Sequence, residues 1–164
     1  MAKNRLVQAS PRLTKGFSAL HRFWYRASGG RLGGSLRGAP AVLLTTTGAK
    51  TGKPRTWPLI ALEVGDGYAF AASNGGHDRN PAWYLNLSAN PAVTVQAGRR
   101  TLDGRARDAT GAERDALWVR FVAVYSGYAD YENATTRRIP VVVVEPVVEP
   151  VVEPTGEPNP GTAR

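Results

Sequence analysis

The chain contains no cysteine, only two histidines and no acidic residue before Glu63. Without cysteine there is no disulfide framework, no thiolate zinc site and no cysteine nucleophile. The two histidines, His21 and His77, lie far apart, and only His77 has a possible ligand beside it, Asp78. A catalytic metal with three protein ligands is therefore not expected, and neither is a serine–histidine–carboxylate triad. These absences leave a metal-free enzyme or a binding protein.

Long apolar runs are absent as well. No segment is long and apolar enough to span a bilayer, and the N-terminus lacks the uninterrupted apolar segment of a secretory signal. We therefore expect a cytoplasmic protein, and its 164 residues match the size of one compact domain. The basic, acid-free start also resembles an organellar transit peptide in composition, an interpretation that we rank below a structured helix.

The net charge of +8 is unevenly distributed along the chain. Eleven lysines and arginines and no acidic residue give the first 62 residues a charge of +11, whereas the remainder carries −3. This asymmetry predicts an anionic partner for the N-terminal part, which could be nucleic acid, an acidic membrane surface or a phosphorylated ligand. Charge alone does not choose among these three.

Near the N-terminus, four large apolar side chains recur at helical spacing: Leu13, Phe17, Leu20 and Trp24. Lysine and arginine side chains fall on the opposite side, so residues 1–32 are expected to form a basic amphipathic helix followed by a glycine-rich linker. The simpler interpretation packs the apolar stripe on the main domain. The alternative lays the helix flat on an anionic membrane, at the inner face of the cell membrane.

Residues 33–146 alternate short β-rich runs with turn signals, at the spacing of a small antiparallel barrel or sandwich. We expect six strands, near residues 41–47, 55–63, 68–73, 92–97, 101–108 and 138–144. A short helix should begin at Asn80-Pro81, and a longer one at Thr110, where Glu113 completes a capping box. Prolines every four residues predict an unpacked, disordered tail over residues 147–164.

The segment from Thr45 to Arg55 combines hydroxyls, glycines and three cations between two expected strands. It is not a Walker loop, because Pro54 stands where a serine or threonine must ligate magnesium, and because a strand follows it. A polar hairpin tip is the ordinary interpretation. The density of amide and cationic donors nevertheless favours a loop that holds a polyanionic ligand.

Two further segments suggest a pocket. The glycine-rich run from Ala71 to Gly76 follows a strand without matching the dinucleotide fingerprint, so a Rossmann fold is rejected, and a flat ligand could lie against its backbone. Tyr125, Tyr128 and Tyr131 repeat every three residues. Because small and polar residues interrupt them, we favour a mobile aromatic wall of a pocket over a buried stripe.

From about Gly33 to Pro146, separated motifs in one order resemble the deazaflavin-dependent nitroreductase family, whose cofactor is coenzyme F420, an 8-hydroxy-5-deazaflavin. These motifs are Leu-Leu-Thr-Thr-Thr-Gly with Lys50-Thr51-Gly52 and Pro54-Arg55, Ala-Ala-Ser-Asn-Gly-Gly, Asn80-Pro81 with Trp83-Tyr84-Asn86-Leu87, Ala89-Asn90-Pro91, Ala106-Arg107-Asp108-Ala109-Thr110, the three tyrosines and Arg138-Ile139-Pro140. The resemblance implies a mainly β (α+β) fold, a split β-barrel of about six antiparallel strands with an N-terminal amphipathic helix and two further helices. It also implies an actinobacterial source.

The resemblance assigns roles to residues in three groups. Lys50, Thr51 and Arg55 would hold the phosphate and the acidic tail of the cofactor. The cofactor ring would be lined by Pro58, Ala71, Ser73, Asn74, Gly75, Pro81 and Trp83. The acceptor would face Tyr125, Tyr128 and Tyr131, in a pocket shaped by Trp57 and Ile60. Ser73, Tyr128 and Tyr131 are the candidate catalytic residues, which would stabilise developing charge or relay a proton.

The expected activity is therefore hydride transfer from reduced F420 to a small acceptor, such as a quinone, an enone or a nitroaromatic compound. The alternatives are a split-barrel protein that binds flavin mononucleotide or haem, and a basic module that binds nucleic acid or membrane without catalysis. Nucleic acid is disfavoured because the aromatic residues are not interleaved with the cations. Three positions depart from the family pattern: Ala49 replaces a frequent arginine, Asn74 an occasional lysine, and Trp57 a smaller residue.

Overall fold

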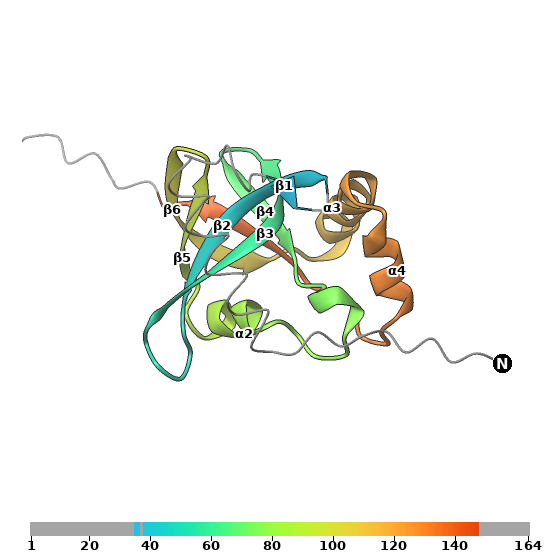
Figure 1. Ribbon diagram of the computed structural model, residues 1–164, viewed down its shortest axis with the longest axis horizontal. Coiled ribbons are helices and arrows are strands. Elements are labelled where there is room, and N and C mark those ends of the chain that lie inside the picture. The colour runs from blue at the N-terminus through green and yellow to red at the C-terminus, as the bar shows by residue number, and fades with distance from the viewer. Residues whose placement is uncertain (1–34, 37, 148–164) are drawn as a thin grey trace, which may run out of the picture.

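Six antiparallel strands close into a barrel in the computed structural model, which describes residues 35–36 and 38–147 (Figure 1). The strands are β2 (Ala39–Thr47), β3 (Pro54–Val64), β4 (Gly67–Ala71), β5 (Ala92–Ala97), β6 (Arg100–Asp108) and β7 (Val141–Pro146). Their order is β2-β3-β4-β7-β6-β5, and pairing of β2 with β5 closes the ring. A two-residue strand, β1 (Ser35–Leu36), pairs with the start of β2. All six expected strands are present.

Three helices and a short 3₁₀ turn accompany the barrel in the described part of the chain. They are the turn η1 (Asn74–Gly76) and the helices α2 (Ala82–Ala89), α3 (Gly111–Val124) and α4 (Gly127–Asn133). Figure 1 shows α3 and α4 together on one side of the barrel and α2 below it. Within the described ranges, no helix combines the length and apolar character needed to cross a membrane. The expected N-terminal helix and C-terminal tail lie outside these ranges, apart from Val147.

The barrel strands are buried on both faces where α3 and α4 cover them. Val142 and Val144 of β7 belong to a cluster that includes the barrel residues Val95 and Phe70, whereas Val141 and Val143 belong to a second cluster with side chains of α3 and α4. Successive side chains of a strand point to opposite faces, so one continuous valine run serves both clusters. The first cluster is the barrel core, and the second is the outer core.

Among the strand boundaries that differ from the sequence-based expectation, two have a clear physical reason. Strand β4 ends at Ala71 instead of Ser73, because Asn74 and the two following glycines take positive φ angles of 49°, 65° and 80°, which no strand accommodates. Strand β7 begins at Val141 instead of Arg138. Pro140 has no N–H for a ladder bond, and its carbonyl accepts a hydrogen bond from the Ala72 amide at 2.8 Å.

Helix α3 begins after Thr110, as expected, but the capping box does not form. The Thr110 side chain makes no capping hydrogen bond, and Glu113 instead accepts two hydrogen bonds from the Arg107 guanidinium, at 2.8 and 2.9 Å. A bidentate, charge-assisted pair of this kind is stronger than a bond to a backbone amide. Helix α2 also begins one residue late, because Pro81 is its N-cap and not its first helical residue.

Candidate active site

A cavity of about 680 Å³ lies between β3, the segment that follows β4, the start of α2 and the region around α4. It is lined by Leu36, Trp57, Pro58, Leu59, Ile60, Ala71, Ser73, Asn74, Gly75, Pro81, Ala82, Trp83, Tyr125, Tyr128 and Tyr131. None of these side chains carries a charge at neutral pH. The lining is aromatic and aliphatic with a few hydroxyl and amide groups, which suits a flat, mostly apolar ligand.

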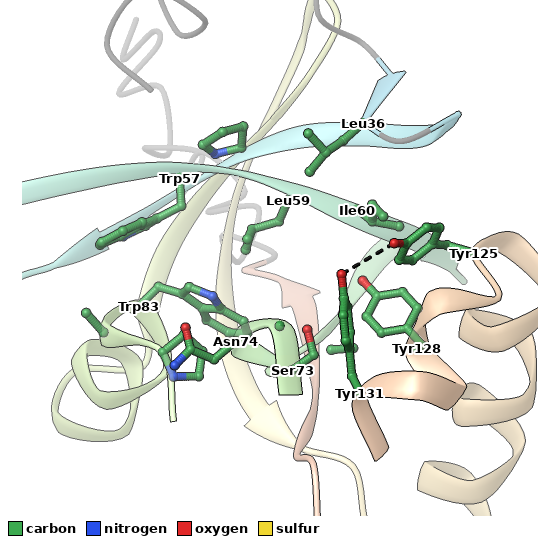
Figure 2. Close-up of a pocket in the computed structure, with 15 residues that line it drawn as sticks. Leu36, Trp57, Leu59, Ile60, Ser73, Asn74, Trp83, Tyr125, Tyr128 and Tyr131 are labelled. Atoms are coloured by element: carbon green, nitrogen blue, oxygen red, sulfur yellow. Dashed lines mark hydrogen bonds between the residues drawn. The ribbon is translucent and has the colours of Figure 1, made fainter. Parts of the chain in front are cut away.

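Figure 2 shows how the labelled side chains divide the cavity. Trp57 and Trp83 lie at one end and the three tyrosines at the other, while Ser73 and Asn74 lie across the cavity from β3. Trp83 is only 3% exposed, and its ring packs edge-on against Phe70 of the barrel core, with the ring centroids 6.4 Å apart. The end formed by Trp83 is therefore fixed by the barrel itself.

Tyrosines form the other end as a packed cluster, the tyrosine wall, defined by Tyr125, Tyr128 and Tyr131. Their ring centroids lie 5.6 to 6.1 Å apart, and the hydroxyls of Tyr125 and Tyr131 are hydrogen-bonded at 3.4 Å. Tyr128 is 5% exposed, and its ring packs edge-on against Phe121 at 5.4 Å and Trp118 at 5.8 Å. From the sequence, burial in the core and lining of a pocket were alternatives for these tyrosines. Tyr128 does both, because its ring is buried against α3 and also lines the cavity.

Polar contacts behind the tyrosine wall join α4 to α3. Glu132 of α4 accepts a hydrogen bond from the Trp118 indole at 2.8 Å and lies 3.6 Å from the buried guanidinium of Arg114. That guanidinium also donates to the Ile139 carbonyl at 3.0 Å and lies 4.8 Å from the centroid of the Trp118 ring. Helix α4, which sequence reasoning missed, is thereby held in one position against the outer core.

The loop from Gly48 to Lys53, which joins β2 to β3, is preformed by its own hydrogen bonds. The Gly48 amide donates to Lys53 O at 2.9 Å, and the Gly52 amide donates to Gly48 O at 2.8 Å. The Asn86 side chain of α2 accepts from the Ala49 amide at 3.1 Å and donates to Thr46 at 3.0 Å. The loop is therefore tied to α2, the helix whose first turn lines the cavity.

The basic side chains of this region have no acidic partner among residues 35–36 and 38–147. Lys50, Lys53 and Arg55 are exposed, and none of them belongs to an ion pair with another residue in the described part of the chain. Unpaired cations on a fixed loop are available to bind an external anion. We call Lys50 and Lys53 of this loop, together with Arg55 at the start of β3, the cation loop.

The structure places the predicted site residues in two groups. Twelve of them line the cavity together: Trp57, Pro58, Ile60, Ala71, Ser73, Asn74, Gly75, Pro81, Trp83, Tyr125, Tyr128 and Tyr131. Lys50, Thr51 and Arg55 do not line it and lie on or next to the β2–β3 loop. Sequence reasoning missed Leu36, Leu59 and Ala82. Leu59 and Ala82 each lie between two predicted cavity residues, and this position could have identified them as lining residues. No motif in the sequence marks Leu36.

These residues fit the cofactor that the motifs imply. An F420-type molecule has a flat deazaflavin ring and an anionic tail, and the chain offers an uncharged cavity beside a loop of unpaired cations. Asn74 and Gly75 line the cavity with positive φ angles of 49° and 65°, and Gly75 has no side chain to hold a flat ring away from the backbone. Ring and tail would therefore be held by different parts of the chain.

Comparison with known proteins supports this fit. The family model for F420H(2)-dependent quinone reductase matches residues 18–146 of the chain. An F420H(2)-dependent quinone reductase of Mycobacterium tuberculosis (strain H37Rv) is 42% identical over 130 residues, which cover 76% of this chain and 87% of the relative.

Solved structures agree with the sequence comparisons. An F420-H2 dependent reductase (FDR-A) has 48% identity and a TM-score of 0.61 over 65% of this chain and 94% of its own. A chain described as a domain-swapped dimer has 40% identity and a TM-score of 0.63 over 83% of this chain and 100% of its own. The split-barrel fold, the F420 cofactor and the deazaflavin-dependent type of oxidoreductase are thereby confirmed. The chain belongs to the F420H(2)-dependent quinone reductase family.

Proposed function

We propose that this protein transfers a hydride from F420H2 to a small quinone that is bound against the tyrosine wall. The observation that carries the proposal is an uncharged aromatic cavity beside a loop of unpaired cations. F420H2, when bound, supplies the chemistry as a two-electron hydride donor. The quinone acceptor is supported by the names of the family and of the mycobacterial relative. Enones and nitroaromatic compounds are proposed as further acceptors of the same pocket.

Each part of the site then has one task. The cation loop and Thr51 bind the phosphate and the acidic tail. Ser73–Gly75, Pro81 and Trp83 hold the ring, and Pro58 and Ala71 complete its lining, Pro58 from β3 across the cavity. The tyrosine wall, with Ile60, positions the acceptor and keeps water away from it, while Trp57 shapes the same pocket from the opposite end of the cavity. Ser73 or the hydroxyls of Tyr128 and Tyr131 stabilise charge on a reduced oxygen or supply its proton.

The activity is tested by adding quinones, enones and nitroaromatic compounds to the protein with F420H2 and following F420H2 oxidation by absorbance. A quinone is expected to be reduced, and failure of all three classes would overturn the proposal. Absorbance spectra after mixing with flavin mononucleotide or haem address the alternative cofactors. A tight complex with either one, without F420 binding, would replace the proposed activity by another split-barrel function.

Tyr128→Phe and Tyr131→Phe are expected to lower kcat/KM for quinones while leaving F420 affinity nearly unchanged. A lost neutral hydrogen bond costs about 0.5–1.5 kcal/mol, which corresponds to roughly a two- to tenfold decrease in kcat/KM. The size of the decrease should differ between a quinone and a nitroaromatic acceptor. Steady-state kinetics and fluorescence titration with oxidised F420 measure the two quantities.

The matched control is Tyr84→Phe, because the Tyr84 hydroxyl donates to Asp108 at 3.0 Å and does not line the cavity. Its kinetics should resemble those of the wild type. Equal losses of F420 binding in both wall variants would place Tyr128 and Tyr131 in the cofactor site or the core instead of the acceptor site.

We further propose that the protein is cytoplasmic and binds peripherally to the inner face of the cell membrane through its basic N-terminal segment. The +11 charge of the first 62 residues and the expected amphipathic segment support this. The mycobacterial origin of the relatives supports the actinobacterial source that the motifs suggested.

Deleting the residues before Gly29 should abolish binding to anionic vesicles, measured by co-sedimentation, and change turnover of soluble acceptors by less than about twofold. Vesicles of neutral lipid are the control and should bind neither form. If the truncated protein fails to fold, the segment packs on the barrel instead. Binding to duplex DNA that weakens steeply with salt would favour the nucleic-acid alternative.

A further inference from the structure

Arg137 does not line the cavity, but its side chain contacts both ends of the segment 72–80, which contributes to one cavity wall. Arg137 lies between α4 and β7, and its guanidinium makes four hydrogen bonds. Its Nη2 donates to Ala72 O at 3.0 Å and to Ser73 O at 2.9 Å. Its Nε donates to His77 O at 2.8 Å, and its Nη1 donates to the Asn80 side chain at 2.6 Å. One guanidinium thus bonds to both ends of the segment 72–80.

The segment 72–80 needs such support because it is not part of the barrel ladder. Asn74, Gly75 and Gly76 have positive φ angles in succession, and an asparagine in that region is less favourable than a glycine. The turn is also close-packed, since a Cβ added at Gly76 would lie 3.0 Å from Ala134 Cβ and 3.1 Å from Tyr131 Cα. A small displacement of the segment would therefore alter its spacing from the tyrosine wall.

The residues that Arg137 holds lead directly into the cavity lining. Ser73, Asn74 and Gly75 line the cavity from within the segment, and Pro81 and Trp83 line it just after the segment ends. We propose that Arg137 is a positioning residue for the cofactor, which fixes the wall against which the deazaflavin ring lies. This inference rests on the proposed function, because that function assigns this wall to the ring.

Lysine cannot reproduce this arrangement. The four acceptors lie in different directions around a planar guanidinium, whereas a lysine offers three donors on a single nitrogen. Burial lowers the pKa of Arg137, while the nearby Asp78 carboxylate opposes this change. The guanidinium is thus partly withdrawn from water, where its hydrogen bonds hold the segment more firmly.

The test compares Arg137→Lys and Arg137→Gln with the neighbouring substitution Arg138→Lys. We expect the Kd for oxidised F420, measured by fluorescence titration, to rise about tenfold in both Arg137 variants. The acceptor KM at saturating F420H2 should change less than this Kd does, because the Arg137 guanidinium bonds to the segment 72–80 and affects the tyrosine wall only through that segment. Arg138 is exposed and pairs with Asp115, so its variant should bind F420 like the wild type.

Chemical rescue separates positioning from general stability. Millimolar methylguanidinium should restore F420 affinity to Arg137→Ala in part, whereas methylammonium, which lacks the planar fork, should not. Asn80→Ala removes only the Nη1 acceptor and should raise the Kd about threefold with an unchanged thermal midpoint. This variant keeps the inference testable if the Arg137 variants do not fold.

The outcomes are distinguishable. Wild-type protein that fails to bind F420 would overturn the proposed function itself. If the wild type binds F420 and Arg137→Lys binds it with the same Kd, only the positioning role is overturned. If the Arg137 variants do not fold, an unchanged Kd in Asn80→Ala overturns it in the same way. The Kd of Arg137→Ala could also rise together with a lowered thermal midpoint and show no response to methylguanidinium. Such a result would overturn the positioning role, because it would indicate a general loss of structure.

Discussion

Lys50→Ala and Arg55→Ala should each weaken F420 binding by roughly ten- to a hundredfold, since a hydrogen bond to a charged group contributes about 1.5–3 kcal/mol. Both side chains are exposed and have no acidic partner among the described residues, so the bound anion is the group expected to pair with them. Fluorescence titration with oxidised F420 at several salt concentrations measures the effect. Salt should weaken wild-type binding more than binding by either variant, because fewer charges remain to be screened.

Arg99→Ala is the matched control, because Arg99 is an exposed cation at the turn between β5 and β6 and does not line the cavity. Its F420 affinity should equal that of the wild type. The thermal midpoint of all three variants should hardly move, since exposed charges contribute little to folding. If the two loop variants bind F420 as tightly as the wild type does, the cation loop is a solvated hairpin tip and not part of the cofactor site.

Phe121→Ala should lower the free energy of unfolding by about 3–5 kcal/mol, the usual cost of deleting a fully buried phenylalanine ring. Phe121 is 0% exposed in the outer core, where its ring supports Tyr128 from behind at 5.4 Å. The cavity left by the ring would therefore loosen the tyrosine wall as well as the fold. Urea denaturation followed by circular dichroism measures the stability change.

Val119→Ala on the same helix controls for helix propensity and position. Val119 is 69% exposed, so its loss should change the unfolding free energy by less than about 0.5 kcal/mol. A loss below about 1 kcal/mol for Phe121→Ala would mean that the outer core tolerates the cavity. The packing described for Tyr128 would then not be what holds α4 in place.

The barrel was predictable because short β-rich runs lie between clear turns, and one of the strands also alternates buried and exposed residues. Strand β6 alternates consistently from Leu102 to Arg107, as its sequence suggests. The valine run of β7 was also recognisable. The start of the strand was not, because it depends on the hydrogen bond from the Ala72 amide to the Pro140 carbonyl, which joins segments far apart in the sequence. Strand existence is encoded locally, and strand ends depend on neighbours.

The site was only partly predictable, for the same reason. Nine of the twelve predicted cavity residues lie in motifs that resemble those of the family, and the resemblance placed seven of the twelve around the cofactor ring and five around the acceptor. Arg137 had no such signal, because its four acceptors lie 57 to 65 residues earlier in the chain. Glu113 is the opposite case. The sequence contains the capping-box motif, but in the structure the Glu113 carboxylate pairs with Arg107 of β6 instead of capping the helix. Which residues bind cofactor and which bind acceptor stays a prediction.

The division between the barrel core and the outer core also bears on how such an enzyme diversifies. Trp83 belongs to the barrel core, whereas Tyr128 belongs to the outer core, so the two ends of the cavity are built on separate layers of packing. Substitutions around α4 can reshape the tyrosine end while the barrel interior keeps its sequence. With the proposed assignment of that end to the acceptor, one inherited cofactor site can be combined with many acceptor preferences through changes in a single layer.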